Sequence, residues 1–405
     1  MTPGADPPLV PESTAAKAPA PARPPLLSRA LLLRLVSVVA VTVSFFLLLS
    51  AVPTHVGRGA AGLATSALML STVLGELAGP RILGRYGHRG PLAAGLFLLG
   101  TPALALPLDG GAAWTASMCL VRGLGFGLTM VAGGALTAAL IPAERRGEGL
   151  ALVGVVGGVP SLVSLPLGVW MSEHLGYVAL TATGGLAALA AIPTVAALRE
   201  VQAPSTPERR AVSAETRALG MVAAVRAVGL RRPTAVFFAT ALAAGILVTF
   251  LPLAVPRASA GIATAALLVQ STASTAARYA AGWYGDRRGA TRLVAPGLLA
   301  SAAGLSMLAA TASPVAVLTG AAVFGTGFGV VQNATLTLMY SRVSRPSYGT
   351  VSALWNLAYD GGMGVGAAGF GLLTTHTGYA WGFALTALMM TAALGPALRD
   401  RRAAA

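Results

Sequence analysis

The stretch RYAAGWYGDRRGATR, from Arg278 to Arg292, is a short charged segment between two long apolar runs. Arg287, Arg288 and Arg292 crowd its second half, and arginine side chains are costly to hold in hydrocarbon. The chain must therefore reach the aqueous surface at this segment and then return. The segment predicts a turn between two membrane spans.

Landmarks of this turn and its neighbours recur 202 residues earlier in the chain. The matching positions are Arg287 and Gly289 with Arg85 and Gly87, the GTGFG run Gly325–Gly329 with the GLGFG run Gly123–Gly127, and Gly349 with Gly147. One offset shared by separate landmarks indicates a duplicated membrane unit, which is how many transporters are built.

Composition also places the chain in a membrane. Of its 405 residues 55% are hydrophobic and 10% are charged, whereas a soluble domain carries about 25% charged residues. The one cysteine, Cys119, lies in an apolar run, which excludes a disulfide framework and a cysteine-rich metal site. The histidines, His55, His88, His174 and His376, lack the paired spacing of metal ligands, so no metal is expected.

The apolar stretches predict the number of spans. A membrane-spanning helix needs about 20 apolar residues. Twelve stretches meet this criterion: 31–53, 59–83, 91–108, 113–141, 149–171, 177–198, 234–255, 261–284, 293–312, 314–340, 350–374 and 378–398. The sequence therefore predicts an all-α membrane protein with twelve transmembrane helices in two pseudo-symmetric six-helix bundles.

The polar segments set the expected domain boundaries. Residues 1–28 are rich in Pro, Ala and Ser and predict a disordered cytoplasmic tail. The segment 199–232 is the long polar connection and predicts a cytoplasmic linker between bundles at 29–198 and 233–398. Residues 399–405 form a second, short cytoplasmic tail.

Arginine and lysine placement predicts the orientation in the cell membrane. With the N-terminus inside, 24 of the 28 basic residues fall in inner segments, and only Arg58 and Arg257 fall in outer turns. Both termini are therefore expected to be cytoplasmic. The net charge of +15 then reflects insertion and contact with anionic lipids on the inner face, and nucleic acid is not an expected partner.

With twelve spans divided six and six and a charged turn after the second span of each half, the chain resembles the major facilitator superfamily. The turn motif of that family reads Gly-x-x-x-Asp-Arg-x-Gly-Arg, and the second-half copy has Gly282, Asp286, Arg287 and Gly289. The first-half copy keeps Arg85 and Gly87. In this copy, Gly84 occupies the position of the Asp, and Pro80 occupies the position of the first Gly.

The resemblance implies a role for the surviving acidic residue of this motif. In the family, the motif Asp pins its turn against the start of a helix in the opposite half. Asp286 would then dock near Arg145 and Arg146. The alternative is that Asp286 only marks a solvated inner turn.

Four ionisable residues lie at bilayer depth, well inside predicted spans, which makes them functional candidates: Glu76, Arg122, Arg278 and Asp360. Glu76 lies about 12 Å and Asp360 about 15 Å from the inner ends of their spans. The resemblance implies that these two spans meet at the interface between the halves. Two acids on one low-dielectric interface resist being ionised together, which suits a proton carrier.

We therefore expect Asp360 to be the principal proton carrier, with Glu76 coupled to it and Arg278 and Arg122 acting in the transport cycle. Asn356, one turn before Asp360, is expected to bind substrate or carboxylate. The alternatives are that Glu76 pairs with Arg81 and that Asp360 only braces the two bundles. Three further polar residues are candidates for lining the substrate cavity or for helix–helix hydrogen bonds: Gln270, Gln332 and Asn333.

The expected function is proton-coupled export of a small lipophilic drug or metabolite by a monomeric secondary transporter. No ATP-binding motif is present, and the glycines of span 350–374 follow no strand, so no nucleotide or other cofactor is expected. The closest alternative is a proton-linked importer of a small neutral metabolite. A membrane enzyme and a non-transporting receptor or scaffold are the alternatives from other classes.

Overall fold

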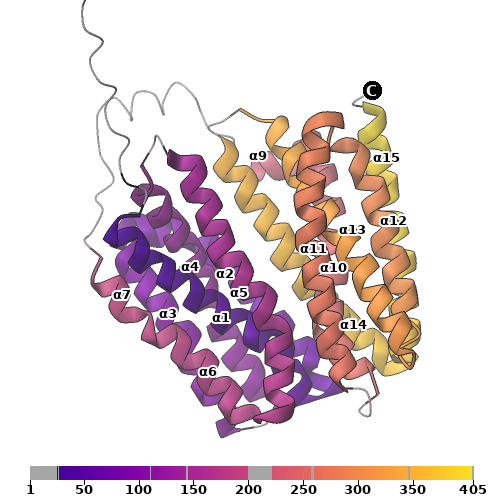
Figure 1. The fold of residues 1–405 in the computed structure, drawn as a ribbon, viewed down its shortest axis with the longest axis horizontal. Coiled ribbons are helices and arrows are strands. Elements are labelled where there is room, and N and C mark those ends of the chain that lie inside the picture. The colour runs from indigo at the N-terminus through magenta and orange to yellow at the C-terminus, as the bar shows by residue number, and fades with distance from the viewer. Residues whose placement is uncertain are drawn as a thin grey trace, which may run out of the picture.

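The structure is a computed structural model that describes residues 25, 27–109, 111–142, 145–198, 221–256, 260–344 and 347–403. Within those ranges every regular element is a helix, as predicted. Figure 1 shows two groups of helices side by side, one from each half of the chain.

The first group comprises α1 (Arg29–Val56), α2 (Arg58–Tyr86), α3 (Arg89–Ala105) with the 3-10 turn η1 (Leu106–Leu108), α4 (Ala112–Leu140), α5 (Arg146–His174), α6 (Tyr177–Ala190) and α7 (Ile192–Ala196). The second group comprises α9 (Met221–Arg226), α10 (Val228–Ala254), α11 (Ala260–Arg288), α12 (Thr291–Leu308), α13 (Pro314–Ser341), α14 (Tyr348–Ala392) and α15 (Leu394–Ala403).

Helix α14 consists of two spans joined at a kink. Gly378 has φ 74° and ψ 172°, a left-handed backbone conformation that favours glycine and turns the chain back. Gly176, before α6, has φ 85° and lies 202 residues earlier. Length and hydropathy alone identify ten candidate membrane helices in the described residues, with 348–400 as one stretch. Dividing it at Gly378 and adding the more polar α11, the counterpart of α2, restores the predicted twelve.

The structure confirms the internal repeat. Helices α2, α3, α4 and α5 each begin 202 residues before α11, α12, α13 and α14. Close helix–helix contacts also recur at positions 202 residues apart. A Cβ at Gly123 would overlap the carbonyl of Leu68, and a Cβ at Gly325 would overlap that of Gln270. The two halves are therefore packed by equivalent residues in equivalent places.

The expected tails and linker fall largely outside the described residues. Of the predicted tail 1–28, the structure describes only residues 25, 27 and 28, and of the linker 199–232 it describes 221–232. Helix α9 and the first residues of α10 occupy this end of the linker, and α15 extends to Ala403, into the predicted C-terminal tail.

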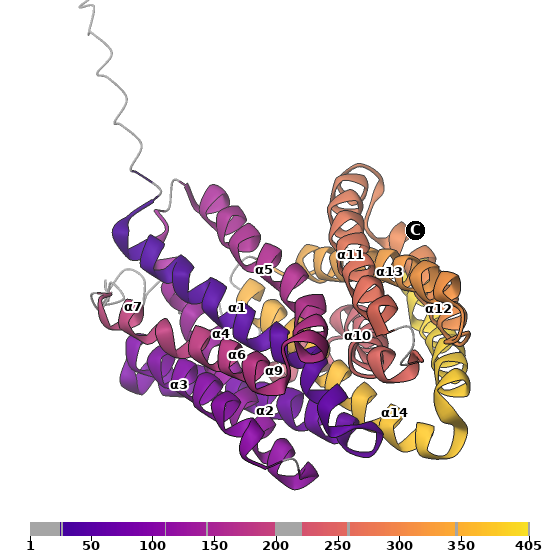
Figure 2. The same cartoon turned by 60° about the horizontal axis from the view of Figure 1, so that its bottom comes forward.

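Helix α14 makes the main contact between the halves, packing on α2, while α1 packs on α10 and α5 on α11 (Figure 2). The Ser66 hydroxyl donates to the carbonyl of Gly364 at 2.8 Å, and Thr249 Oγ1 donates to Thr65 Oγ1 at 3.1 Å. Both bonds lie toward the end of the bundle away from the C-terminus, here called the outer end. The two groups diverge toward the other, inner end, where the C-terminus lies (Figure 1).

Candidate functional site

The two membrane carboxyl groups lie on α2 and α14, the two helices that make the main contact between the halves. Asp360 on α14 is 5% exposed, and Glu76 on α2 is half-buried. Glu76 is near enough to Asp360 to influence it electrostatically. Asp360 lies one turn before Gly364, whose ideal Cβ position is 2.9 Å from Met69 Cβ on α2. Residues four apart share a helix face, so Asp360 lies on the face of α14 that packs against α2.

Arg278 approaches the same region from α11. Its side chain is exposed, and its electrostatic neighbour is Tyr359, the residue before Asp360. Arg278 is the counterpart of Glu76 in the repeat, so equivalent positions of α2 and α11 carry opposite charges. Tyr359 was not among the residues predicted from sequence. The sequence feature that could have identified Tyr359 is its position next to Asp360 within a predicted span.

A cluster of aromatic rings adjoins Tyr359 on α10, α13 and α14. The ring centroids of Phe237 and Trp355 are 4.4 Å apart with planes 11° apart, and those of Trp355 and Tyr359 are 6.2 Å apart with planes 6° apart. Phe328 lies 6.3 Å from Tyr359. The buried indole Nε1 of Trp355 has no hydrogen-bond partner within the described residues. The region beside Asp360 thus offers apolar ring surface and an unused donor.

Arg122 lies apart from the carboxyl pair, inside the first bundle. The side chain is 0% exposed. Its Nη2 donates to the carbonyl of Ser44 at 3.0 Å and its Nε to that of Leu99 at 3.4 Å. The side chains that act on it electrostatically are Cys119 and Tyr177. The structure therefore does not bring Arg122 to Asp360 and Glu76.

The four polar candidates for substrate contacts occupy different surroundings. Gln270 is 6% exposed, lies where α11 packs on α13 and accepts a hydrogen bond from Ser271 at 3.3 Å. Asn333 faces Gly282 of α11, where an added Cβ would lie 3.4 Å from its Nδ2. Both therefore contribute to packing within the second bundle. Asn356 and Gln332 are half-buried, and Asn356 lies one turn from Asp360.

The turn motif forms the ends of two helices. Gly289 after α11 has φ 87°, and Gly87 after α2 has φ 71°, so both matched glycines adopt the left-handed conformation. Arg287 lies 3.9 Å over the ring of Trp283 and donates to its carbonyl at 3.1 Å. Arg85 lies 5.5 Å from the ring centroid of Tyr86. The side chains of Asp286 and Arg146 fall outside the described part of the structure, so the predicted latch stays a prediction.

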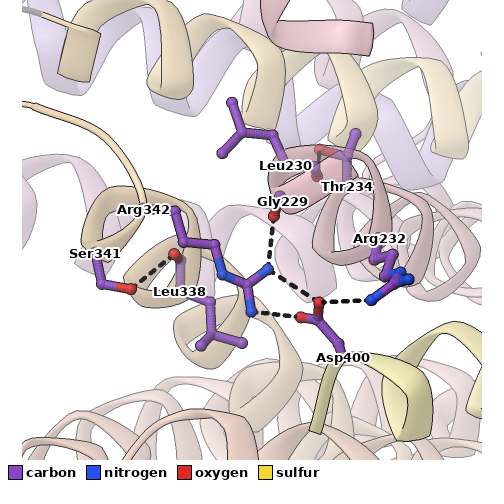
Figure 3. Close-up of polar contacts among 8 residues, drawn as sticks. All are labelled: Gly229, Leu230, Arg232, Thr234, Leu338, Ser341, Arg342 and Asp400. Atoms are coloured by element: carbon purple, nitrogen blue, oxygen red, sulfur yellow. Dashed lines mark hydrogen bonds and ion pairs between the residues drawn. The ribbon is translucent and has the colours of Figure 1, made fainter. Parts of the chain in front are cut away.

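Sequence reasoning missed a cluster of charges at the inner end of the second bundle (Figure 3). Asp400 on α15 accepts two hydrogen bonds from Arg342, at 3.1 and 2.7 Å, and lies 3.8 Å from Arg232. Arg342 also donates to the carbonyl of Gly229 at 2.6 Å. The cluster joins α10, the end of α13 and α15. Arg342 and Asp400 are far apart in sequence, so no local pattern signals their pairing.

Comparisons with known proteins agree with this architecture. The family model described as Major Facilitator Superfamily matches residues 30–367. A search of curated proteins found no match. Among solved structures, the chain is similar to that of a mutant of the nucleoside transporter NupG, with a TM-score of 0.67 and 12% identity over 93% of this chain and 99% of that chain. At this identity the likeness shows the fold alone. Because the family model covers most of the chain, this multi-pass membrane protein belongs to the Major Facilitator Superfamily.

Proposed function

We propose that this transporter couples proton movement to export of small lipophilic molecules by alternating access. One observation carries the proposal: Asp360 is buried at the contact between the halves, with Glu76 as its charged neighbour. Ionisable groups at membrane depth are costly and mark ion pathways. Asp360 is the principal proton carrier in this proposal, and Glu76 is coupled to it.

The position of the two carboxyl groups supports coupling to the motion of the halves. Asp360 lies about 6 Å along α14 on the inner side of Gly364, where α14 packs against α2. Two ionised carboxyl groups at this contact would repel each other, and a protonated group can be buried at lower cost. Protonation therefore favours the closed contact. Loss of the proton favours opening of this contact. Arg278, close to Tyr359, then offsets the negative charge of the ionised carboxyl group.

Substrate would bind on the inner side of the outer contact. The aromatic cluster of Phe237, Phe328, Trp355 and Tyr359 offers ring faces to an apolar body. Asn356, on α14 beside Asp360, and Trp355 Nε1 offer polar contacts. The protein works as a monomer in the cell membrane, with both termini cytoplasmic. The charge asymmetry of its turns, which places most basic residues beside anionic lipids, supports this orientation.

The test is transport in inverted membrane vesicles from cells that make the wild type, Asp360→Asn or Asp360→Glu. In this orientation, export appears as uptake of lipophilic dyes and drugs into the vesicles. We expect uptake that needs an inward-acid proton gradient, is abolished by an uncoupler and by Asp360→Asn, and is partly kept by Asp360→Glu. Unchanged, proton-dependent uptake by Asp360→Asn at equal expression would remove the carrier role.

Import of a small neutral metabolite is the second candidate. The fold similarity to a nucleoside transporter supports import as an alternative. The uncharged side chains of Asn356 and Gln332 would suit a neutral polar substrate. The same vesicles distinguish the two. Import predicts proton-driven nucleoside uptake into right-side-out vesicles, whereas export predicts that dyes leave them.

A further inference from the structure

Helices α2 and α14 meet along one seam that contains both the outer contact and the carboxyl groups. The α2 residues of this seam follow the spacing of one helix face: Gly62, Ser66, Met69 and Glu76. Their partners on α14 run in the opposite direction along the chain: Ala367, Gly364 and Asp360. Because helices move as rigid elements, separation at one end of this antiparallel seam also shifts the other end.

Gly62 lies where α2 approaches the main chain of α14. A Cβ at this position would overlap the carbonyl oxygen of Ala367 and lie 3.3 Å from its carbonyl carbon. Among the glycines that the structure describes, only Gly62 would bring a Cβ within 3.0 Å of a main-chain atom of the other half. A main-chain atom moves only with its helix. Any side chain at this position would therefore push α2 and α14 apart.

The internal repeat shows that the fold does not require a glycine here. Helices α11 and α5 also join the halves, and α11 has Thr264 at the position equivalent to Gly62. Ser66 is 6% exposed at the α2–α14 seam, whereas its counterpart on α11, Leu268, is 44% exposed. The glycine therefore serves the close approach of α2 to α14 in particular.

The carboxyl groups lie toward the other end of the same seam. Glu76 lies about 21 Å farther along α2 than Gly62. Between them, the Ser66 hydroxyl donates to the carbonyl of Gly364, one turn from Asp360. Closure of the outer contact and the placement of the two carboxyl groups are therefore set by the same pair of helix faces.

Few groups beside the seam at this depth can respond to pH. Those close to Asp360 are Glu76 on α2, Arg278 on α11, and Tyr359, its neighbour in the chain. The other helices packed on α14 are α9, α10, α12, α13 and α15, and α13 carries no charged residue, while those of the rest lie toward the inner end. An effect of pH on the α2–α14 contact therefore reports on the carboxyl groups.

We propose that Gly62 is a positioning residue for the proton site, because its lack of a side chain lets α2 close on α14 and so holds Glu76 beside Asp360. The inference rests on the proposed proton-coupled cycle and adds a residue to it. With glycine at this position, the protonated seam closes fully at its outer end. With a side chain there, the outer end stays apart whatever the state of the carboxyl groups.

The test measures how fast a membrane-impermeant maleimide, added outside intact cells, labels a cysteine at the outer contact. The parent chain carries Thr65→Cys as the reporter and Cys119→Ala. Thr65 is 2% exposed and hydrogen-bonded to Thr249 of the other half, so labelling requires the contact to open. Adding Gly62→Ala should speed labelling about fivefold or more, because overpacking of a close contact shifts the equilibrium by that factor.

Gly59→Ala is the matched control. Gly59 lies on the same helix, and a Cβ there would meet nothing within 4 Å. The substitution brings the same gain in helix propensity without the overlap, so labelling should match that of the parent chain. Gly364→Ala is a milder change in the same seam, since its Cβ would lie 2.9 Å from Met69 Cβ, which belongs to a movable side chain. It should speed labelling less than Gly62→Ala, and it replaces that variant in the test if Gly62→Ala does not fold.

The pH dependence separates positioning from packing. Rates are divided by the rate for an exposed cysteine, introduced as Gly59→Cys, to correct for ionisation of the thiol. In the parent chain, labelling should slow as the pH falls, because protonation of the carboxyl groups closes the contact. Gly62→Ala should remove most of this dependence. A merely structural role would raise the rate by the same factor at every pH.

The outcomes distinguish this inference from the proposed function. Equal labelling rates in Gly62→Ala and Gly59→Ala would overturn the inference and leave the proposed function intact. Faster labelling in Gly62→Ala with an unchanged pH dependence would overturn the positioning role. A parent chain whose labelling does not change with pH would instead contradict the proton-coupled cycle, on which the inference rests.

Discussion

Arg34, near the inner end of α1, shows how a single buried charge joins two helices. It is 7% exposed. Its Nε donates to the carbonyl of Gly133 at 3.2 Å and to Thr137 Oγ1 at 3.1 Å, and its Nη1 donates to Ser37 Oγ at 2.7 Å. Unlike Arg122, it leaves no fully buried nitrogen without a partner among the described residues. We therefore assign it a structural role between α1 and α4.

Arg34→Gln should lower the thermal stability of the first bundle. The shorter amide cannot make all three bonds, and each buried group left without a partner costs about 1–3 kcal/mol. The measurement is the melting temperature of the purified protein in detergent, with Arg34→Lys as the control that keeps the charge and is expected to melt between the two. An unchanged melting temperature in Arg34→Gln would show that the buried bonds contribute nothing.

The contrast among the buried charges shows what sequence could predict at this scale. Hydropathy singles out Glu76 and Asp360 because both lie well inside long apolar runs. Arg34 also lies in such a run. Because it is close to the predicted inner end of its span, the sequence analysis counts it among the cytoplasmic basic residues. Whether a charge is satisfied depends on partners about a hundred residues away, such as Gly133 and Thr137. No local pattern carries that information.

At the scale of elements, the charge cluster around Asp400 holds α15 to the rest of the second bundle. Asp400 is 7% exposed and accepts both of its short hydrogen bonds from Arg342. Two Arg342 nitrogens bind the two oxygens of one carboxylate, a geometry that is stronger than a single contact. We therefore expect this pair to hold α15 against the inner ends of α10 and α13.

Asp400→Asn should release α15. Breaking a buried pair costs about 3–5 kcal/mol, and the 22% exposure of the Arg342 side chain reduces this through solvent screening. We expect faster proteolysis at the C-terminus and a lower melting temperature. Arg232→Gln is the matched control and should have a smaller effect, because its contact with Asp400 is 3.8 Å. Equal protease resistance of Asp400→Asn and the wild type would contradict the assignment.

The sequence predicted the positions of the helices more accurately than the residues at which they begin and end. Each predicted span overlaps a long helix or one arm of α14, in three cases together with the short helix that follows, because a stretch of apolar residues in lipid must satisfy its main-chain groups internally. Helix ends were less predictable. Helix α15 begins at Leu394 and α9 lies in the predicted linker, since short helices are stabilised by tertiary contacts rather than by hydropathy.

At the scale of the whole molecule, the repeat was visible in sequence, but the conformation was not. Glycines and arginines 202 residues apart predicted two equivalent bundles, because close helix packing needs glycine at the same places in each. Which ends of the bundles touch depends on a balance between alternative packings of the same surfaces. That balance leaves no pattern along the chain, and only the cross-bundle contacts reveal it.

These contacts predict that a cross-link at the outer end will stop transport. Thr65 and Thr249 lie in different halves with their hydroxyl oxygens 3.1 Å apart, so the γ-atoms of cysteines at these positions would be close to each other. Transport by alternating access requires this contact to open. Thr65→Cys with Thr249→Cys, in a chain carrying Cys119→Ala, should therefore cross-link under oxidation and lose transport, and reduction should restore it. Cys119→Ala follows the repeat, which has Ala321 at the equivalent position. Each single cysteine variant is the control and should transport equally with and without oxidant. If the fully cross-linked protein still transported at the rate of the reduced one, the outer contact would not be a gate.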